Sequence, residues 1–281
     1  MHQLHRLCAL ALPALLLLPS VACGADPLAT MSAFCRADGL GARLTARAWQ
    51  DAVAPLVTWE LEPAWDHVYS ISGYEIGPPR LDGSDVVVEV SYTILTDISA
   101  GGAVEGARLE AHTFRLIQPD PNGEWRVAGP PPAPHVFASE IDEKKMAAAL
   151  DPQTGSYVSN SSFIWEMLRA AGWAVPYLDT AQLATAPQLT HTESPMFGDV
   201  VVYYDGANPY HVGFIDEDQH VLSATLNAGL RRTIADAFPG EHRYFRFRAL
   251  PETPTPGPAL TAEESTTPAP PAPQRDTSEE P

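Results

Sequence analysis

The residue of this chain best suited to acid–base chemistry is His211, which precedes Val212 and Gly213 at an apolar strand pattern. Histidine titrates close to neutral pH, and a glycine two positions on lets a ligand backbone approach. A second candidate is Ser161, a hydroxyl in the first turn of a helical pattern. A hydroxyl beside an imidazole base is the nucleophile of serine hydrolases, so this pair could hydrolyse an amide if the fold joined them.

The sequence carries no motif for a metal, a phosphate group or a cofactor. The remaining histidines are scattered without the spacing of metal ligands, so no metal site is predicted. Gly-rich phosphate loops, dinucleotide fingerprints and Gly-x-Ser-x-Gly elbows do not occur in the sequence either. We therefore expect no cofactor.

Hydrophobic periodicity predicts the elements that position His211 and Ser161. Residues 159–172 form an amphipathic helical pattern that ends at Gly172. The dipeptide Gly198-Asp199 follows, and it opens the first of three strand patterns. These strand patterns cover residues 200–204, 212–215 and 221–224.

This order of elements resembles that of the NlpC-type cell-wall peptidases, which have a papain-like fold. In that family the helix begins Asp-Cys-Ser-Gly-Phe, the first strand begins Gly-Asp, and the second begins with the catalytic histidine of His-Val-Gly. Here Gly198-Asp199 and His211-Val212-Gly213 match directly, while the helix begins Ser-Asn-Ser-Ser-Phe. The resemblance covers residues 157–248, about a third of the chain.

The resemblance places Asn160 at the position of the catalytic cysteine. Ser161 then matches the serine of the motif, and the third polar catalytic position, usually His, Asn or Gln, falls at Ser223. The implied site is therefore a degenerate one that consists of His211, Asn160, Ser161 and Ser223.

Asn160 cannot take over the role of a catalytic cysteine. A thiol at a helix N-terminus has its pKa lowered from about 8.5, whereas a carboxamide has no proton to lose. Asparagine is a good N-cap residue, worth ~1 kcal/mol over alanine, so we expect Asn160 to cap the helix. Ser161 stays open as a nucleophile, although one helical step turns its side chain about 100° from position 160.

Three functions stay open on this basis. One is a pseudo-enzyme that binds a peptidoglycan stem peptide or an envelope protein without hydrolysis. Another is an active peptidoglycan peptidase or amidase that uses Ser161 with His211, and the third is a non-catalytic envelope scaffold. The missing cysteine favours the pseudo-enzyme. An open groove with Asn160 beside His211 would support it, a Ser161–His211 hydrogen bond would support the hydrolase, and a filled groove the scaffold.

Residues 26–136 have the pattern of a separate α+β domain. Helical periodicity in residues 44–56 gives way to strand alternation from residue 68 to residue 128, with a hairpin turn at 120–123. This succession resembles the cone-shaped domains of the ketosteroid-isomerase type, where an antiparallel sheet curls around a helix. A fold of this type can hold an internal pocket, for which Trp49, Trp59 and Tyr92 are candidates, but aromatic residues at such positions are more often core residues than ligand contacts.

The predicted fold class is thus α+β throughout, with a cone-shaped domain followed by an NlpC-like papain-fold domain at residues 137–250. Residues 1–25 have the features of a signal peptide, and residues 251–281 form a Pro-, Thr- and Glu-rich tail that we expect to be disordered. Cleavage before Cys23 would leave that residue for a lipid anchor. We expect an exported protein, periplasmic or extracellular, without a transmembrane span.

The net charge of −18 argues against a nucleic-acid partner. Binding a polyanion requires clustered Lys and Arg, and no basic stripe is present in the sequence. The acidity fits the solvated surface of an exported protein.

Overall fold

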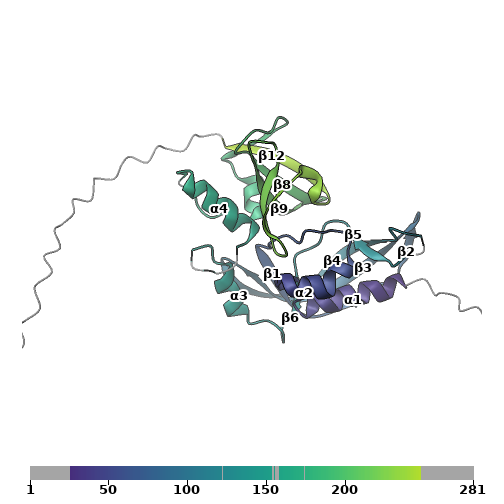
Figure 1. Cartoon of the computed structure of the whole chain (residues 1–281). Helices are drawn as coiled ribbons and strands as arrows, with labels where there is room; N and C mark the ends of the chain where they lie inside the picture. The colour runs from purple at the N-terminus through teal and green to yellow at the C-terminus, as the bar shows by residue number, and fades with distance from the viewer. Residues whose placement is uncertain (1–25, 122, 154, 156–157, 174, 248–281) are drawn as a thin grey trace, which may run out of the picture.

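The computed structural model describes residues 26–247, apart from residues 122, 154, 156–157 and 174 (Figure 1). This part of the chain is a mixed α+β structure with two β-sheets. The predicted signal peptide and tail lie outside the described residues. Among the described helices, none has the length and apolar character needed to cross a membrane.

The first sheet comes from the N-terminal half and has the strand order β5-β4-β3-β1-β6, with β2 paired to β3. Only β1 and β6 run parallel. Its strands are β1 (His67–Ile76), β2 (Arg80–Asp82), β3 (Asp85–Ser99), β4 (Gly102–Ile117), β5 (Arg126–Ala128) and β6 (His135–Phe137). In β3, buried residues alternate with residues that are mostly half-buried, which confirms the predicted strand and gives the sheet one apolar face.

That apolar face packs against α1 (Pro27–Gly39), which lies along the sheet in Figure 1. The helix starts with Asp26 as its N-cap and Pro27 in its first turn, where a missing N–H costs nothing. Phe34 and Cys35 of α1 are fully buried in the same core as Val90 and Tyr92 of β3. Cys35 is therefore a core residue, as expected.

The helical pattern predicted over residues 44–56 is interrupted in the structure. The chain there forms four short turns, because Pro55 lacks the N–H that a continuous helix needs and Thr45 caps a new start. These turns are η1 (Ala42–Leu44), α2 (Ala46–Ala48), η2 (Trp49–Val53) and η3 (Ala54–Leu56).

The second sheet is entirely antiparallel, with the order β11-β10-β9-β8-β12-β7. Its strands are β7 (Leu189–Thr192), β8 (Val200–Asp205), β9 (Asn208–Ile215), β10 (Val221–Thr225), β11 (Gly229–Thr233) and β12 (Glu241–Phe247). Successive residues of β8 face two separate apolar clusters, so the whole run from Val200 to Tyr204 is buried. This explains why the sequence shows no alternation there.

Of the helices that follow β6 in the chain, α3 (Glu143–Leu150) contacts β3 and β4 of the first sheet, whereas α4 (Asn160–Ala170) and α5 (Thr180–Thr185) contact β9 of the second sheet. Ile164 of α4 packs in the same buried cluster as Val200 and Val212. The predicted cap of α4 is wrong by one residue. Ser159 is the N-cap and accepts a hydrogen bond from the Ser162 N–H, while Asn160 is the first helical residue. A serine hydroxyl can cap as well as a carboxamide, so position 160 is left for another role.

Residues 57–66 connect the two sheets. Val57 bridges to Val127 of the first sheet, and Pro63 bridges to Thr225 of the second. The Leu226 N–H donates to the Glu62 carbonyl at 2.8 Å, and the Asn160 N–H donates to the Ala64 carbonyl at 2.7 Å. This segment therefore fixes the start of α4 against the N-terminal half.

The Glu62 side chain anchors the connecting segment in the core. Its carboxylate accepts hydrogen bonds from the indole N–H groups of Trp49, Trp59 and Trp65, and from Arg43. Glu62 and Arg43 are both completely buried. The expected pocket at Trp49, Trp59 and Tyr92 is therefore not found, because these rings are core residues and two of them bind Glu62.

Replacement of Glu62 by Gln tests this anchor. The buried Arg43 charge would keep only the more distant Asp38, at 3.4 Å, as an anionic partner, so the free energy of unfolding should fall by about 3 kcal/mol. Glu60→Gln, an exposed carboxylate on the same segment, should change it by less than about 0.5 kcal/mol. Urea denaturation measures both variants. Equal free energies of unfolding for Glu62→Gln and the wild type would show that the Glu62 carboxylate does not anchor the connecting segment.

Candidate functional site

The structure brings together two of the four predicted site residues. The Nδ1 atom of His211, in β9, lies 2.8 Å from Oδ1 of Asn160, at the start of α4. The Asn160 carboxamide also donates to the Tyr210 carbonyl at 3.4 Å. Both side chains have zero exposure to solvent. The pair occupies the relative positions expected of a nucleophile and its base, but it lies inside the molecule.

An aromatic side chain covers the imidazole of His211. The ring centre of Phe238 lies 3.9 Å from that of His211, and Tyr203 flanks the imidazole at 5.5 Å. Within the described part of the chain, Nε2 of His211 has no hydrogen-bond partner. Burial lowers the pKa of His211 to about 3. The ring is therefore neutral at physiological pH and is a weak base.

Ser223 does not act as the residue that orients the imidazole. It lies in β10 with zero exposure, and its hydroxyl has no hydrogen-bond partner among the described residues. Without a hydrogen-bond partner at Nε2 among the described residues, the His211 ring lacks the third group that positions a catalytic imidazole.

Ser161 is held by a different set of partners. Its hydroxyl donates to Oδ1 of Asp66 at 2.6 Å and lies 2.8 Å from the Tyr177 hydroxyl. The Ser161 backbone N–H also donates to Asp66. Ser161 thus turns away from His211, as the helical rotation predicts.

Asp66 is a site-forming residue that the sequence analysis missed. Its second oxygen accepts from the backbone N–H and the hydroxyl of Thr180, so one buried carboxylate binds the first residues of both α4 and α5. A negative charge at two helix N-termini is stabilised by both helix dipoles. Nothing in the sequence marks the role, because Asp66 is distant along the chain from both helices.

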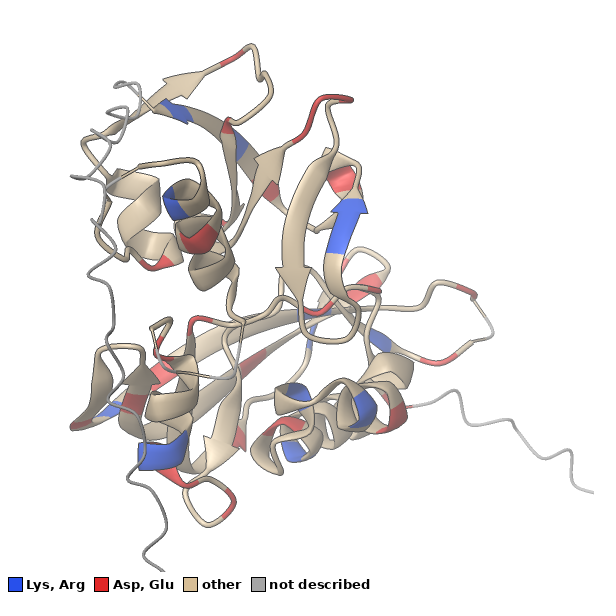
Figure 2. Cartoon of the chain, turned by 60° about the vertical axis from the view of Figure 1, so that its left-hand side comes forward, with Lys and Arg blue, Asp and Glu red and all other residues tan. Residues whose placement is uncertain are grey.

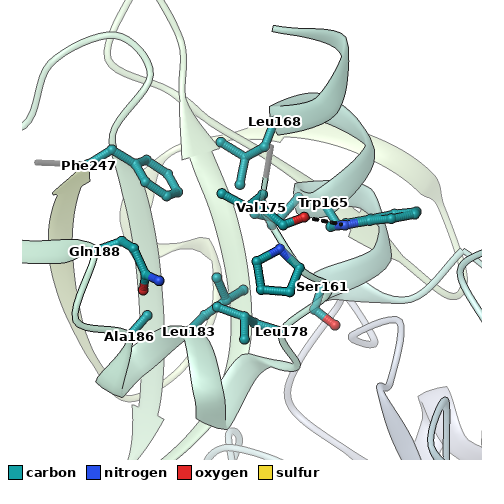
Figure 3. Close-up of a pocket in the computed structure, with 11 residues that line it drawn as sticks. Ser161, Trp165, Leu168, Val175, Leu178, Leu183, Ala186, Gln188 and Phe247 are labelled. Atoms are coloured by element: carbon teal, nitrogen blue, oxygen red, sulfur yellow. Dashed lines mark hydrogen bonds between the residues drawn. The ribbon is translucent and has the colours of Figure 1, made fainter. Parts of the chain in front are cut away.

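A small apolar crevice lies on the far side of α4. Figure 3 shows Leu168, Leu183 and Phe247 facing it from α4, α5 and β12, and Val175 accepting a hydrogen bond of 3.1 Å from the Trp165 indole. The crevice is nearly closed by these side chains. Its only polar groups are at its edge, so it offers little to orient a ligand.

A much larger cleft of about 590 Å³ lies between the two halves. Tyr69, Glu110 and His112 line it from the first sheet, and Tyr177 and Asp205 line it from the second half. Neither Asn160 nor His211 reaches its wall. The open space of the molecule is therefore separate from the degenerate pair.

The walls of this cleft are acidic. Four carboxylates, from Asp66, Glu110, Asp179 and Asp205, contribute to the lining, and no lysine or arginine does within the described residues. Burial raises the pKa of Asp205. Figure 2 shows Lys and Arg dispersed among more numerous Asp and Glu over both halves. The cleft is thus suited to a positively charged group.

Comparison of the chain with protein-family models, with curated proteins and with solved structures found no significant match. The likeness to the NlpC-type peptidases therefore rests on the sequence motifs alone.

Asn160→Cys tests whether the Asn160–His211 pair is inaccessible to small reagents in solution. In a chain that begins at Asp26, the new thiol should resist iodoacetamide in the folded state, because Phe238 covers the site. Phe238→Ala should expose it, at a cost of ~3–5 kcal/mol in stability. Mass spectrometry after timed alkylation, with circular dichroism to confirm folding, gives the comparison.

Met167→Cys, at an exposed position of α4, is the matched control and should react at once. Rapid alkylation of Asn160→Cys with Phe238 in place would show that the groove is open.

The buried His211 also predicts a dependence of stability on pH. The unfolded chain binds a proton at this residue near pH 6.5, whereas the folded chain does so only near pH 3. The unfolded state therefore holds more protons between these values, and the free energy of unfolding falls as the pH falls. His211→Gln should make this slope shallower by up to about 1.4 kcal/mol per pH unit between about pH 6 and pH 4. Urea titrations at several pH values measure it. Unchanged slopes would mean that the ring is solvated.

Proposed function

We propose that the chain is an exported, non-hydrolytic binding protein of the cell envelope, whose ligand site is the acidic cleft between its two sheets. The second half is then a papain-like domain in which catalysis has been lost, and the first half is a cone-like domain that supplies the other wall of the cleft. The observation that carries the loss of catalysis is the buried Asn160–His211 hydrogen bond of 2.8 Å.

Amide hydrolysis needs a nucleophile and a base in contact with it, and the described residues do not provide this arrangement. No thiol lies at position 160, the described free cysteine is Cys35, and burial raises its pKa to about 12. The Ser161 hydroxyl donates a hydrogen bond to Asp66, whose two oxygens also accept from Thr180 and from backbone N–H groups, and both Ser161 and His211 are shielded from solvent. Activation of Ser161 by His211 requires a contact between them, and among the described residues the side-chain hydrogen bond of His211 goes to Asn160 instead.

The chemistry of the cleft supports a ligand with a free ammonium group. Carboxylates on both walls can pair with such a group, and Tyr69, Tyr177 and Tyr210 offer aromatic surface with hydroxyl groups. A peptidoglycan stem peptide presents one such ammonium group on its diamino acid. The motif resemblance to cell-wall peptidases favours the same ligand class.

A second candidate function is that of an envelope scaffold without a small ligand. It is favoured by the filled site around His211, where Phe238 occupies the space that a substrate backbone would need. The cleft distinguishes the two candidates, because a scaffold has no reason to keep acidic groups around an open space.

Binding of a synthetic stem peptide to Asp205→Asn and wild-type protein tests the proposal. Loss of one ion pair in the cleft should weaken binding roughly tenfold in calorimetry. Asp236→Asn, an exposed carboxylate outside the cleft, should bind like the wild type. Wild-type protein should release no cleavage products in the same samples.

Two outcomes would contradict this assignment. Peptide cleavage that Ser161→Ala abolishes would establish the hydrolase instead. Absence of binding to the folded wild type would leave the scaffold function.

A further inference from the structure

We propose that Glu110, His112 and His135 form a binding site for a divalent transition metal ion of the Zn²⁺ class, at the side of the cleft formed by the first sheet. This site is separate from the peptide-binding proposal and does not depend on it.

The three side chains converge although they come from distant strands. Each offers one ligand atom, and these atoms lie within 4.8 Å of one another. Glu110 and His112 are two positions apart in β4, so they project from the same face, and His135 begins the edge strand β6, which β3 and β1 separate from β4. The His112 and His135 ring centres are 5.3 Å apart at 72°. The pairing of β6 with β1 and the curvature of the sheet bring the three together.

The spacing is close to that of a metal centre. Bond lengths of about 2.0–2.2 Å in a tetrahedral Zn²⁺ site place neighbouring ligand atoms about 3.4 Å apart. Oε1 of Glu110 and Nε2 of His112 are 2.9 Å apart. A rotation of these two partly exposed side chains would admit an ion, with no movement of the backbone.

His135 points to a ligand that the protein itself does not supply. It has zero exposure, and neither ring nitrogen has a hydrogen-bond partner within the described part of the chain. Its Nδ1 lies 3.9 Å from Asp38, too far for a hydrogen bond, and the nearby Ala133 carbonyl does not complete one either. Proteins avoid burying a polar group in this way, and a bound ion would use the free lone pair.

The protonation states suit a metal. Burial, together with the positive fields of His112 and Arg43, lowers the pKa of His135 well below its ordinary value, so the imidazole is neutral. The hydrogen bond from His112 lowers the pKa of Glu110, which is therefore ionised. Metal ligands must be in these deprotonated forms.

The groups around the cluster leave the ligand atoms free. Arg108 contacts the other oxygen of Glu110, at 3.4 Å, and so leaves Oε1 for the ion. The Arg43 charge is offset by Glu62 and Asp38. Asp38 also lies beside Nδ1 of His135, where a small shift would let it accept the N–H proton and orient the ring, as carboxylates do behind metal-bound histidines.

The arrangement leaves one side of the ion open. Two imidazoles and a carboxylate fill three positions of a tetrahedral Zn²⁺ ion, and the fourth would take water or a ligand. Glu110 and His112 line the cleft, whereas His135 lies behind them, so the open position faces the cleft. A borderline ion such as Zn²⁺ is the best match to this mixture of nitrogen and oxygen donors.

Zinc titration of the untagged, chelator-treated full chain tests the site. Calorimetry should show one equivalent of Zn²⁺ bound per chain, and thermal melting should rise with the Zn²⁺ concentration. His112→Asn and Glu110→Gln alter partly exposed residues, so they should fold while binding Zn²⁺ roughly 100-fold more weakly or worse. His135→Asn should lose binding as well.

A matched control uses the exposed pair His191 and Glu193 near the second sheet's edge, with 3.8 Å between Nδ1 and Oε1. His191→Asn should leave Zn²⁺ binding unchanged. Substitution with Co²⁺ should give visible absorption bands that His112→Asn removes. Absence of Zn²⁺ binding to the wild type, or equal binding by wild type and the folded His112→Asn protein, would overturn the proposal.

Discussion

A buried carboxylate, that of Glu62, holds the two halves of the molecule in register. Three indole N–H groups and Arg43 donate to it, so the charge is neutralised and each donor is satisfied without water. A carboxylate is costly to bury without partners. The positions of Arg43 and of the three indole rings around it are therefore fixed. The backbone of Glu62 also forms hydrogen bonds with residues 226 and 227. The first core is therefore held in a fixed position relative to the second sheet.

Four residues further on, Asp66 uses the same segment to organise the start of α4 and α5. Its two oxygens accept from both helix N-termini, which places Ser161 and Thr180 side by side around one charge. The hydroxyl of Ser161 is thereby committed to the fold. The Ala64 carbonyl of the same segment accepts a hydrogen bond from the Asn160 N–H, so Asn160 is fixed through its backbone as well as through its side-chain contact with His211.

The sequence was informative where local patterns determine local structure. The strand alternation around Val88 and Val90, the helix that carries Ile164, and the proximity of Asn160 to His211 were all predicted. The strands β7, β11 and β12 were missed. They are short, or polar residues occupy their exposed positions, so the sequence shows no clear strand pattern there. The cluster of Glu110, His112 and His135 was missed for a different reason. Its three residues come close together only because the sheet is curved. Their spacing along the sequence does not indicate this proximity.

The two polar sites of this chain differ in their exposure to solvent. Around His211, desolvation keeps the imidazole neutral and Phe238 occupies the approach, so an added nucleophile alone would not restore a catalytic base. In the cleft, carboxylates and histidines remain open to water and can exchange it for a ligand. A thiol placed at position 160 would meet the same covered imidazole, because Phe238 packs against His211. The cleft, by contrast, presents its carboxylates to an open volume, so the part of this structure that can exchange water for a ligand lies away from Asn160 and His211.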